Sequence, residues 1–302
     1  MNNVLILGGG GWSASFFISY IIEKKLHQSF NFIAVDKEFN STNKHISSIK
    51  GDLLDGFFLK KLIVNFKPYY IINFAGLFKS DNSAAMLDVN FTISYNLLSA
   101  IKELKIKPKN ILFIGSAAEY GEQNKDLLNE TLSCNPINIY GLTKSLQTTL
   151  MSFYKKNYAL KICIARPFNL VGKGMPKSLA LGSFISQIQS CKDGSDVSVG
   201  NLNTERDFTH IKDAVKAYWL LLECGESGET YNICSGKTYK IENVLKKLII
   251  FSGKNLIINT DHKRKQKNDL NTSCGDSNKI FNLTGWKPSL DVLSSLKEHF
   301  NG

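Results

Sequence analysis

Asn3-Val-Leu-Ile-Leu-Gly-Gly-Gly-Gly-Trp-Ser-Ala14 stands almost at the start of the chain and decides its fold. Apolar residues up to Leu7 predict a buried strand, and the pattern from 13 to about 26 predicts a helix. Four glycines join the two, and glycine lets a backbone turn with positive φ and approach a phosphate at a helix N-terminus. With Ala14 in place of a third glycine, this is a GxxGxxG loop, which predicts dinucleotide binding at Gly8, Gly11 and Trp12. The alternative is a glycine turn without a ligand.

Strand and helix patterns alternate beyond this loop. We expect strands at 31–35, 69–73, 110–114 and 159–165, and helices at 55–66, 84–104 and 139–156. This alternation predicts an α/β fold with a Rossmann-like, doubly wound parallel sheet. After Pro167 the alternation loosens into helices at 179–190, 211–223 and 241–252, short strands near 197 and at 230–233, and an irregular tail. We therefore expect an NAD(H)-binding domain at 1–166, which also receives roughly 205–232, interleaved with a smaller α/β substrate lobe at 167–302.

Composition excludes several other classes of protein. The chain has 302 residues, 43% of them hydrophobic, and a formal charge of +11. Its only dense basic run, Lys263 to Lys267, has no interleaved aromatic residues, so we expect a solvated loop and no nucleic-acid partner. Six scattered cysteines without CxxC spacing favour reduced thiols over a metal site or disulfides. No apolar run reaches the roughly 20 residues of a membrane span, and no signal segment precedes the first strand, so we expect a cytoplasmic protein.

The ends of the next strands suggest which dinucleotide binds. Asp36 follows the second strand, where a carboxylate accepts hydrogen bonds from the adenosine ribose and repels a 2′-phosphate. NAD(H) is therefore favoured, with NADP(H) as the alternative because Lys37 is adjacent. Asp52 and Leu53 follow a short third strand, where they would contact adenine or simply form a turn.

Tyr140 and Lys144 lie four residues apart and so share one face of the predicted helix. A nearby ammonium group favours the phenolate, so we expect the pKa of Tyr140 to fall from about 10 toward neutrality. Ser116 follows the strand at 110–114 and so lies at the carboxyl edge of the sheet, where ligands of doubly wound folds bind. The three residues together predict proton transfer to or from a carbonyl oxygen.

Taken together, these segments resemble the extended short-chain dehydrogenase/reductase family, whose members are nucleotide-sugar epimerases, dehydratases and reductases, over nearly the whole chain. The resemblance implies that Ser116 donates a hydrogen bond to the substrate oxygen, Tyr140 is the acid/base, and Lys144 supports it and binds the nicotinamide ribose. It also implies further cofactor contacts after the fourth and sixth strands and in the helix between them, at Phe74, Ala75, Gly76, Asn90 and Arg166.

Substrate contacts are implied by the same resemblance. Arg206, in an Arg-Asp-Phe segment, would bind the diphosphate of a nucleotide sugar bidentately, the alternative being a surface ion pair with Asp207. The other implied substrate residues are Ser116, Ala117, Glu119, Asn169 and Lys173. Within the family, the stretches 166–174, 199–202, 231–236 and 283–288 are most similar to the GDP-4-keto-6-deoxy-D-mannose reductases, although Lys173 and Met175 depart from their pattern.

Dehydratases of this family carry acidic residues just after the catalytic serine, where this chain has Ala117 and Ala118. Glu119 is displaced by one residue, so dehydration is disfavoured. We expect an NAD(P)H-dependent C4 reductase of a GDP-4-keto-6-deoxy hexose or heptose. The alternative is a C4 epimerase or C4 dehydrogenase with tightly bound NAD, and a third hypothesis is a non-catalytic nucleotide-binding protein. The resemblance also implies a homodimer formed through the two long helices, and a role in polysaccharide biosynthesis.

Overall fold

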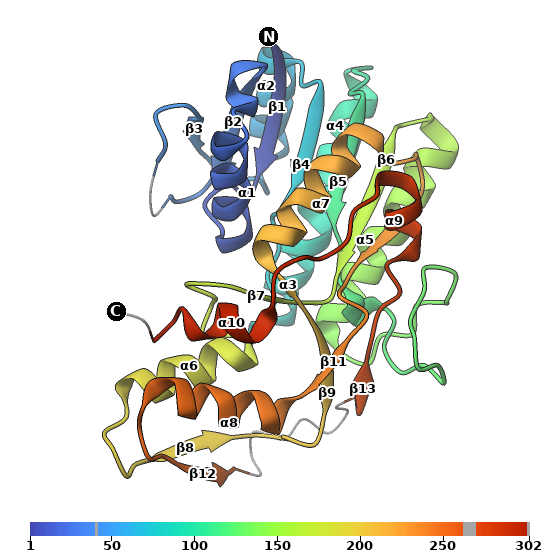
Figure 1. Cartoon of the computed structure of the whole chain (residues 1–302). Helices are drawn as coiled ribbons and strands as arrows, with labels where there is room; N and C mark the ends of the chain where they lie inside the picture. The colour runs from blue at the N-terminus through green and yellow to red at the C-terminus, as the bar shows by residue number, and fades with distance from the viewer. Residues whose placement is uncertain (40–41, 262–269, 301–302) are drawn as a thin grey trace.

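A seven-stranded parallel sheet forms the centre of the computed structural model, which describes residues 1–39, 42–261 and 270–300 (Figure 1). Its strand order is β10-β6-β5-β4-β1-β2-β3. The strands are β1 (Asn2–Leu7), β2 (Phe30–Asp36), β3 (Ser47–Lys50), β4 (Tyr70–Asn73), β5 (Asn110–Ile114), β6 (Ile162–Pro167) and β10 (Thr230–Ile233). Residues 4–7 of β1 have no exposed surface, because helices cover both faces of the sheet.

Two layers of helices enclose this sheet. On one face lie α1 (Trp12–Glu23) and α7 (Ile211–Cys224), which bury Phe17, Tyr218 and Trp219 against the strands. On the other face lie α2 (Gly56–Phe66), α4 (Ile93–Glu103) and α5 (Ile139–Tyr158), with a second apolar core. This arrangement confirms the predicted doubly wound α/β fold.

The predicted long helix at 84–104 is interrupted in the structure. It consists of α3 (Ser83–Leu87), a π-helical turn (Asp88–Thr92) and α4. The turn contains Asn90, whose fully buried amide bonds to the main chain of Leu77 after β4. Such turns inside helices are frequent at functional sites, and this one directs a polar side chain toward the end of the sheet.

A smaller lobe lies below the carboxyl ends of the central strands in Figure 1. Its helices are α6 (Ala180–Ser190), α8 (Ile241–Ser252) and α10 (Val292–Lys297), and β8 (Asp196–Val199) pairs in parallel with β12 (Ile257–Thr260). A second small sheet places β9 (Glu205–His210) beside β7 (Asn169–Val171), β11 (Thr238–Lys240) and β13 (Thr272–Ser273). The tail expected to be irregular therefore contains strands and also α9 (Asn278–Thr284) and α10.

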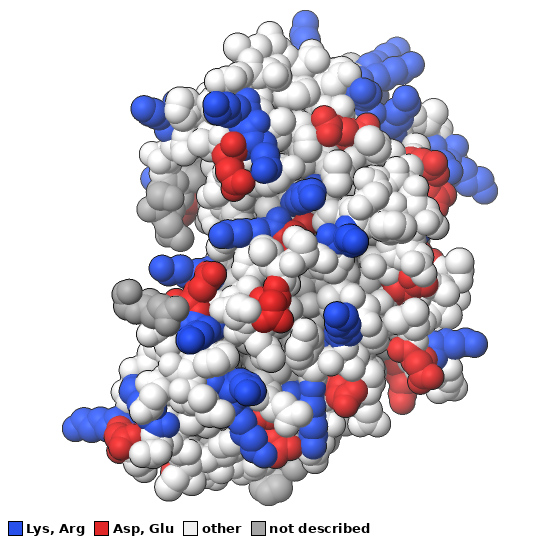
Figure 2. Space-filling view, viewed as in Figure 1, with Lys and Arg blue, Asp and Glu red and all other residues white. Residues whose placement is uncertain are grey.

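The chain crosses between the two parts more than once. Of the segment 205–232 that we expected the large domain to receive, α7 and β10 lie with the central sheet, whereas β9 lies in the small sheet. The predicted basic loop at 263–267 falls outside the described residues. On the face in Figure 2, Lys and Arg side chains are interspersed with Asp and Glu. Within the described ranges, no helix combines the length and apolarity needed to cross a bilayer.

Candidate active site

The glycine loop after β1 is held against β2 and β4. The Gly8 N–H donates to the Val35 carbonyl at 2.9 Å, and its φ of +73° lies in the left-handed region. A Cβ on Gly8 would stand 2.5 Å from the Ala75 nitrogen, so only glycine fits. Gly11 then starts α1 without any side-chain cap, which leaves backbone N–H groups of the first turn for an anion. The loop therefore fits a dinucleotide pyrophosphate.

A cavity of about 580 Å³ opens beside this loop and reaches the small lobe. Its lining includes the loop from Gly9 to Trp12 together with Gly174 and Pro176. The Trp12 indole N–H donates to the Lys173 carbonyl at 3.0 Å, while the Lys173 side chain is exposed. These two predicted site residues thus connect the phosphate loop to the substrate lobe.

The adenosine end of the predicted cofactor site has a firmly held carboxylate. Asp36 is half-buried, and it accepts the Gly10 N–H at 2.9 Å and the Lys37 N–H at 2.7 Å. The Lys37 ammonium lies 3.1 Å from Asp52, and both side chains are largely exposed. The Leu53 side chain packs in the core beside α2, and the contact of Asp52 and Leu53 with adenine stays a prediction.

Ser116 begins a short turn (Ala117–Glu119) that packs directly on α5. The Ser116 hydroxyl accepts the Ala118 N–H at 3.1 Å, and it lies near enough to the Tyr140 phenol to act on the pKa of that group. Tyr140 is the second residue of α5. Gly141 allows this packing, because a Cβ there would lie 2.3 Å from the Ala118 carbonyl oxygen. The predicted serine and tyrosine therefore meet at the carboxyl end of β5.

Lys144 is 4% exposed and is held by the end of β5 and by its own helix. Its ammonium donates to the Ile114 carbonyl at 2.8 Å and lies 3.4 Å from the Gln147 amide oxygen. The Gln147 amide in turn donates to Ser94 of α4 at 2.7 Å. Sequence reasoning missed Gln147. Its signal was a polar residue three positions after Lys144, on the same helix face.

The predicted fall of the Tyr140 pKa is wrong in direction. Burial raises the pKa of Tyr140 to about 12; the hydrogen bond from Ser116 opposes this shift and the charge of Glu119 adds to it. Burial also lowers the pKa of Lys144 to about 8, against the attraction of Glu119. The sequence argument counted the nearby charge but omitted desolvation, which disfavours both charged forms here. Tyr140 is therefore a protonated phenol at neutral pH.

The structure places Glu119 and Arg166 inside the protein rather than at a ligand surface. Glu119 accepts Arg166 at 2.8 Å and the Thr148 hydroxyl at 2.7 Å, and its other oxygen accepts the Ser116 N–H at 2.8 Å. Glu119 is 0% exposed and Arg166 3%, with the guanidinium over the Tyr120 ring. This placement differs from the expected contacts of Glu119 with substrate and of Arg166 with cofactor. Both side chains instead support the turn that carries Ser116.

The segment after β4 has a fixed backbone beside the glycine loop and Lys144. Asn73 accepts the Ala75 N–H at 3.0 Å, and the Phe74 ring packs on Phe17 with centroids 5.4 Å apart. A Cβ on Gly76 would lie 3.3 Å from the Lys144 ammonium. Phe74, Ala75 and Gly76 are thus brought together with the catalytic lysine, and their contacts with a cofactor stay predictions.

The remaining predicted substrate residues come from both parts of the chain. Ala117 is half-buried beside Ser116 on the large domain. Asn169 of β7 donates to the Asp207 carbonyl at 2.9 Å, and Arg206 of the neighbouring strand β9 donates to the Glu205 carbonyl at 2.9 Å. The buried Asp207 carboxylate accepts main-chain N–H groups of Ser235, Gly236 and Gly275. Asn169 and Arg206 thus share one small sheet, and their substrate contacts stay predictions.

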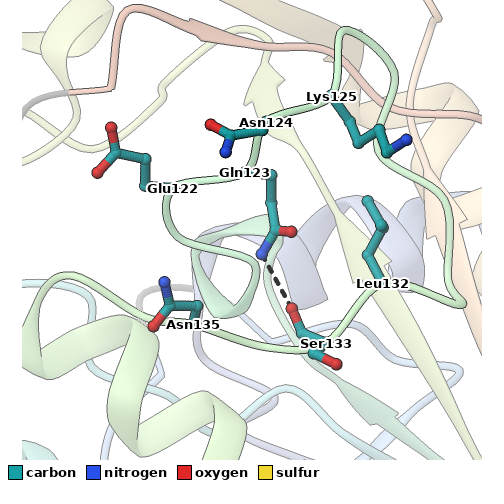
Figure 3. A pocket seen from close by; sticks show the side chains of 7 residues that line it. All are labelled: Glu122, Gln123, Asn124, Lys125, Leu132, Ser133 and Asn135. Atoms are coloured by element: carbon teal, nitrogen blue, oxygen red, sulfur yellow. Dashed lines mark hydrogen bonds between the residues drawn. The ribbon is translucent and has the colours of Figure 1, made fainter.

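A second cavity, of about 500 Å³, lies in the loop between the Ser116 turn and α5 (Figure 3). Its lining is formed by Glu122, Gln123, Asn124, Lys125, Leu132, Ser133 and Asn135, and the Gln123 amide donates to the Ser133 carbonyl at 2.9 Å. None of the predicted site residues lines it. Among the described residues, no group of three or more His, Cys, Asp and Glu side chains could hold a metal ion.

Comparison with known proteins places this geometry among nucleotide-sugar enzymes. A family model described as GDP-mannose 4,6 dehydratase matches residues 5–299. The chain is 31% identical over 219 residues to GDP-6-deoxy-D-mannose reductase of Pseudomonas aeruginosa, covering 71% of this chain and 72% of that protein. It is 25% identical over 284 residues to GDP-6-deoxy-D-talose 4-dehydrogenase of Aggregatibacter actinomycetemcomitans, covering 93% and 91%.

Solved structures share the fold over almost the whole chain. RMD from Pseudomonas aeruginosa complexed with NADPH superposes with a TM-score of 0.83 at 24% identity, covering 99% of this chain and 98% of that one. The UDP-glucose 4-epimerase of Thermotoga maritima with UDP-glucose gives 0.86 at 23% identity, with the same coverage. At these identities the two superpositions support the fold.

Proposed function

This chain belongs to the GDP-mannose 4,6-dehydratase family of extended short-chain dehydrogenases/reductases, and we propose that it catalyses NAD(P)H-dependent reduction of the C4 carbonyl of a GDP-4-keto-6-deoxy sugar. The sugar is a hexose or heptose, and Tyr140 donates the proton. The alternative within the same site is a C4 epimerase or C4 dehydrogenase that keeps NAD bound.

One observation carries the choice of reduction over dehydration. The turn after Ser116 has alanine at its first two positions, and its only carboxylate, Glu119, is sealed in an ion pair with Arg166. Dehydration needs a base that removes a proton from C5, and this turn presents none. Ser116 and Tyr140, which carbonyl reduction requires, lie together at the carboxyl end of β5.

The raised pKa of Tyr140 suits a proton donor. A phenol with a pKa of about 12 is protonated at neutral pH, which is the form that can donate to a developing alkoxide. The reverse oxidation uses the same residues, so this pKa supports the acid/base role of Tyr140 in either direction. Support for reduction comes from the 31% identical relative that is named as a reductase.

Each residue has a defined part in the proposed reaction. Ser116 accepts the Ala118 N–H, and its own hydroxyl hydrogen can turn from the Tyr140 phenol to donate to the C4 oxygen. Tyr140 transfers its phenolic proton to the same oxygen. Lys144, fixed on the Ile114 carbonyl beside Gly76, binds the nicotinamide ribose and stabilises the phenolate that remains. The bound dihydronicotinamide supplies the hydride.

We propose NAD(H) as the favoured cofactor, with NADP(H) as the alternative. Support comes from Asp36, whose carboxylate is fixed by two backbone N–H groups where a 2′-phosphate would lie. The nearby Lys37 ammonium is paired with Asp52, which reduces its ability to attract that phosphate. One similar structure is a complex with NADPH, so the ratio of the two cofactors has to be measured for this chain.

For the substrate, we propose that Arg206 binds the diphosphate and that Asn169 and Lys173 lie along the nucleotide sugar. Support for a GDP-linked sugar comes from the two relatives named for GDP-6-deoxy sugars. We propose that 1–166 together with α7 and β10 holds the cofactor, and that the rest of 167–302, which includes β9, holds the sugar. A role in polysaccharide biosynthesis follows if the product is a GDP-6-deoxy sugar.

The deciding experiment identifies any nucleotide that the purified protein carries and then measures turnover of NADH. Purified protein is denatured and the released small molecules are identified by mass spectrometry, and then NADH and GDP-4-keto-6-deoxy-D-mannose are added while absorbance at 340 nm is followed. We expect empty protein and NADH consumption. Stoichiometric bound NAD without net consumption would support the epimerase or dehydrogenase instead, and binding without any chemistry would leave a non-catalytic nucleotide-binding protein.

We also propose a homodimer, formed through α4 and α5, in the cytoplasm. Large apolar side chains on these helices are exposed in the single chain: Tyr95, Leu142, Leu146 and Phe153. Covering such a stripe with the same stripe of a second copy would remove it from water. The six unpaired cysteines fit a reducing compartment. Sedimentation at micromolar concentration tests the dimer.

A further inference from the structure

Phe78 is an exposed aromatic residue in direct contact with the catalytic tyrosine. Its ring meets the Tyr140 ring edge to face, with centroids 5.0 Å apart and planes at 74°, yet 47% of the residue is exposed. An apolar ring left partly in water costs free energy unless something covers it. The position beside the reacting phenol therefore suggests that a ligand completes the burial of Phe78.

The contact is held in place by buried hydrogen bonds. Asn90 accepts the Leu77 N–H at 2.7 Å and donates to the Leu77 carbonyl at 3.0 Å, so both polar groups of the residue before Phe78 are fixed. The same Asn90 amide donates to the Thr143 hydroxyl at 2.9 Å, and Thr143 lies one turn after Tyr140 on α5. One buried side chain thus sets the position of Phe78 relative to Tyr140.

The chemistry of the reacting sugar indicates what covers the ring. Reduction at C4 places the C4 oxygen at the Tyr140 hydroxyl. C3 and C5 flank C4, and C5 carries C6, which is the apolar end of a 6-deoxy sugar. In a 6-deoxy hexose that substituent is a methyl group, and in a 6-deoxy heptose it begins with a methylene. Both are apolar, whereas an ordinary hexose has a hydroxyl there, whose burial against an aromatic ring costs free energy.

We propose that Phe78 is a specificity-determining residue whose ring contacts the C5–C6 side of the sugar and selects 6-deoxy sugars over their 6-hydroxy counterparts. This inference rests on the proposed C4 reduction, since that reaction brings the neighbours of C4, among them C5 with C6, close to Tyr140. It assigns a task to a residue outside the Ser116, Tyr140 and Lys144 constellation.

The test uses two ligands that differ only in the oxygen at C6. Dissociation constants of GDP-6-deoxy-D-mannose and GDP-mannose are measured by calorimetry for the wild type and for Phe78→Ala. We expect the wild type to prefer the deoxy ligand at least about threefold, the effect of one hydroxyl against an apolar surface. In Phe78→Ala, the deoxy ligand should bind about twofold to tenfold more weakly, and the preference should fall to within about twofold of unity.

Matched controls separate a sugar contact from other effects. Phe281→Ala removes an equally exposed ring on α9 and should change neither constant. GDP alone and NADH should bind Phe78→Ala as they bind the wild type, and Phe78→Tyr should keep the preference. In turnover, KM for the keto sugar should rise while kcat stays within about twofold.

Three results would overturn the inference: an unchanged preference in Phe78→Ala, an equal loss of GDP or NADH binding, or a fall in kcat with KM unchanged. The last would make Phe78 a positioning residue of Tyr140 rather than a sugar contact. A wild type that neither binds GDP sugars nor consumes NADH would overturn the proposed function and this inference together. An active wild type with an unaffected Phe78→Ala would overturn the inference alone.

Discussion

The turn after β5 has two sides that use ionisable groups in opposite ways. On one side Ser116, Tyr140 and Lys144 converge, and Tyr140 is only half-buried. On the other side Glu119 and Arg166 form an ion pair that is almost entirely enclosed. A buried pair with additional hydrogen bonds fixes structure, whereas an unpaired phenol beside a hydroxyl can transfer a proton. Ser116 and Glu119 are three positions apart in sequence, yet Ser116 is half-buried beside Tyr140 while Glu119 is fully buried against Arg166.

The largest expected effect comes from removing the Tyr140 hydroxyl on the reactive side of the turn. Tyr140→Phe removes the phenolic proton but keeps the ring, so turnover should fall by about two to four decades. The dissociation constant of NADH and the free energy of unfolding should stay close to those of the wild type. Steady-state kinetics and chemical denaturation measure these quantities, and full activity in the variant would remove Tyr140 from the mechanism.

The second-largest effect concerns the buried ion pair of Glu119 and Arg166. Glu119→Gln leaves the Arg166 charge buried without its partner, which should destabilise the fold by about 3 to 5 kcal/mol. Urea denaturation measures the change, and the exposed pair Lys60–Glu103 supplies the control, because Glu103→Gln should barely shift the midpoint. Equal midpoints for the two variants would contradict a structural role of the buried pair.

A pH series sharpens the comparison at Lys144. Its pKa is about 8 when folded and 10.5 in the ordinary case, so between these values the folded state has released a proton that the unfolded state still holds. Below pH 8 the buried charge of Lys144 therefore lowers the free energy of unfolding. This free energy rises between pH 8 and about 10.5, by about 3 kcal/mol. Lys144→Met should lack this rise. Parallel stability curves for the wild type and the variant would disprove the depressed pKa.

The smallest effect concerns Asp36. Its carboxylate accepts backbone hydrogen bonds, as Glu119 does, but it is only half-buried. Asp36→Ala should raise the ratio of NADP(H) to NAD(H) preference by roughly tenfold, because it removes a charge that repels the 2′-phosphate. The ratio of kcat/KM for the two cofactors measures this. An unchanged ratio would mean that Asp36 is not at the ribose.

Sequence reasoning succeeded where the signal was local. The strand, glycine loop and helix at the start of the chain, and the alternation that follows, predicted a parallel doubly wound sheet that the structure confirms. Ser116, Tyr140 and Lys144 were found because strand ends in such a sheet share one edge and because residues four apart on a helix share one face.

It failed where the answer depended on burial. Glu119 and Arg166 are 47 positions apart, and only the pairing of β5 with β6 brings them together inside the protein. The pKa of Tyr140 was expected to fall and instead rises, because desolvation depends on packing that the spacing of Tyr140 and Lys144 does not reveal. The contact of Phe78 with Tyr140 likewise depends on the interrupted helix that carries Asn90.

By itself, then, the sequence determined the fold class, the phosphate loop and the three residues of the reactive constellation, since periodicity and strand-end position are properties of short segments. Only the tertiary structure decided which carboxylate faces the site and which is sealed, which way each pKa moves, and which aromatic ring meets the catalytic phenol. The physical reason is that exposure and dielectric environment are set by neighbours from distant parts of the chain, whereas motif spacing is set within a few residues.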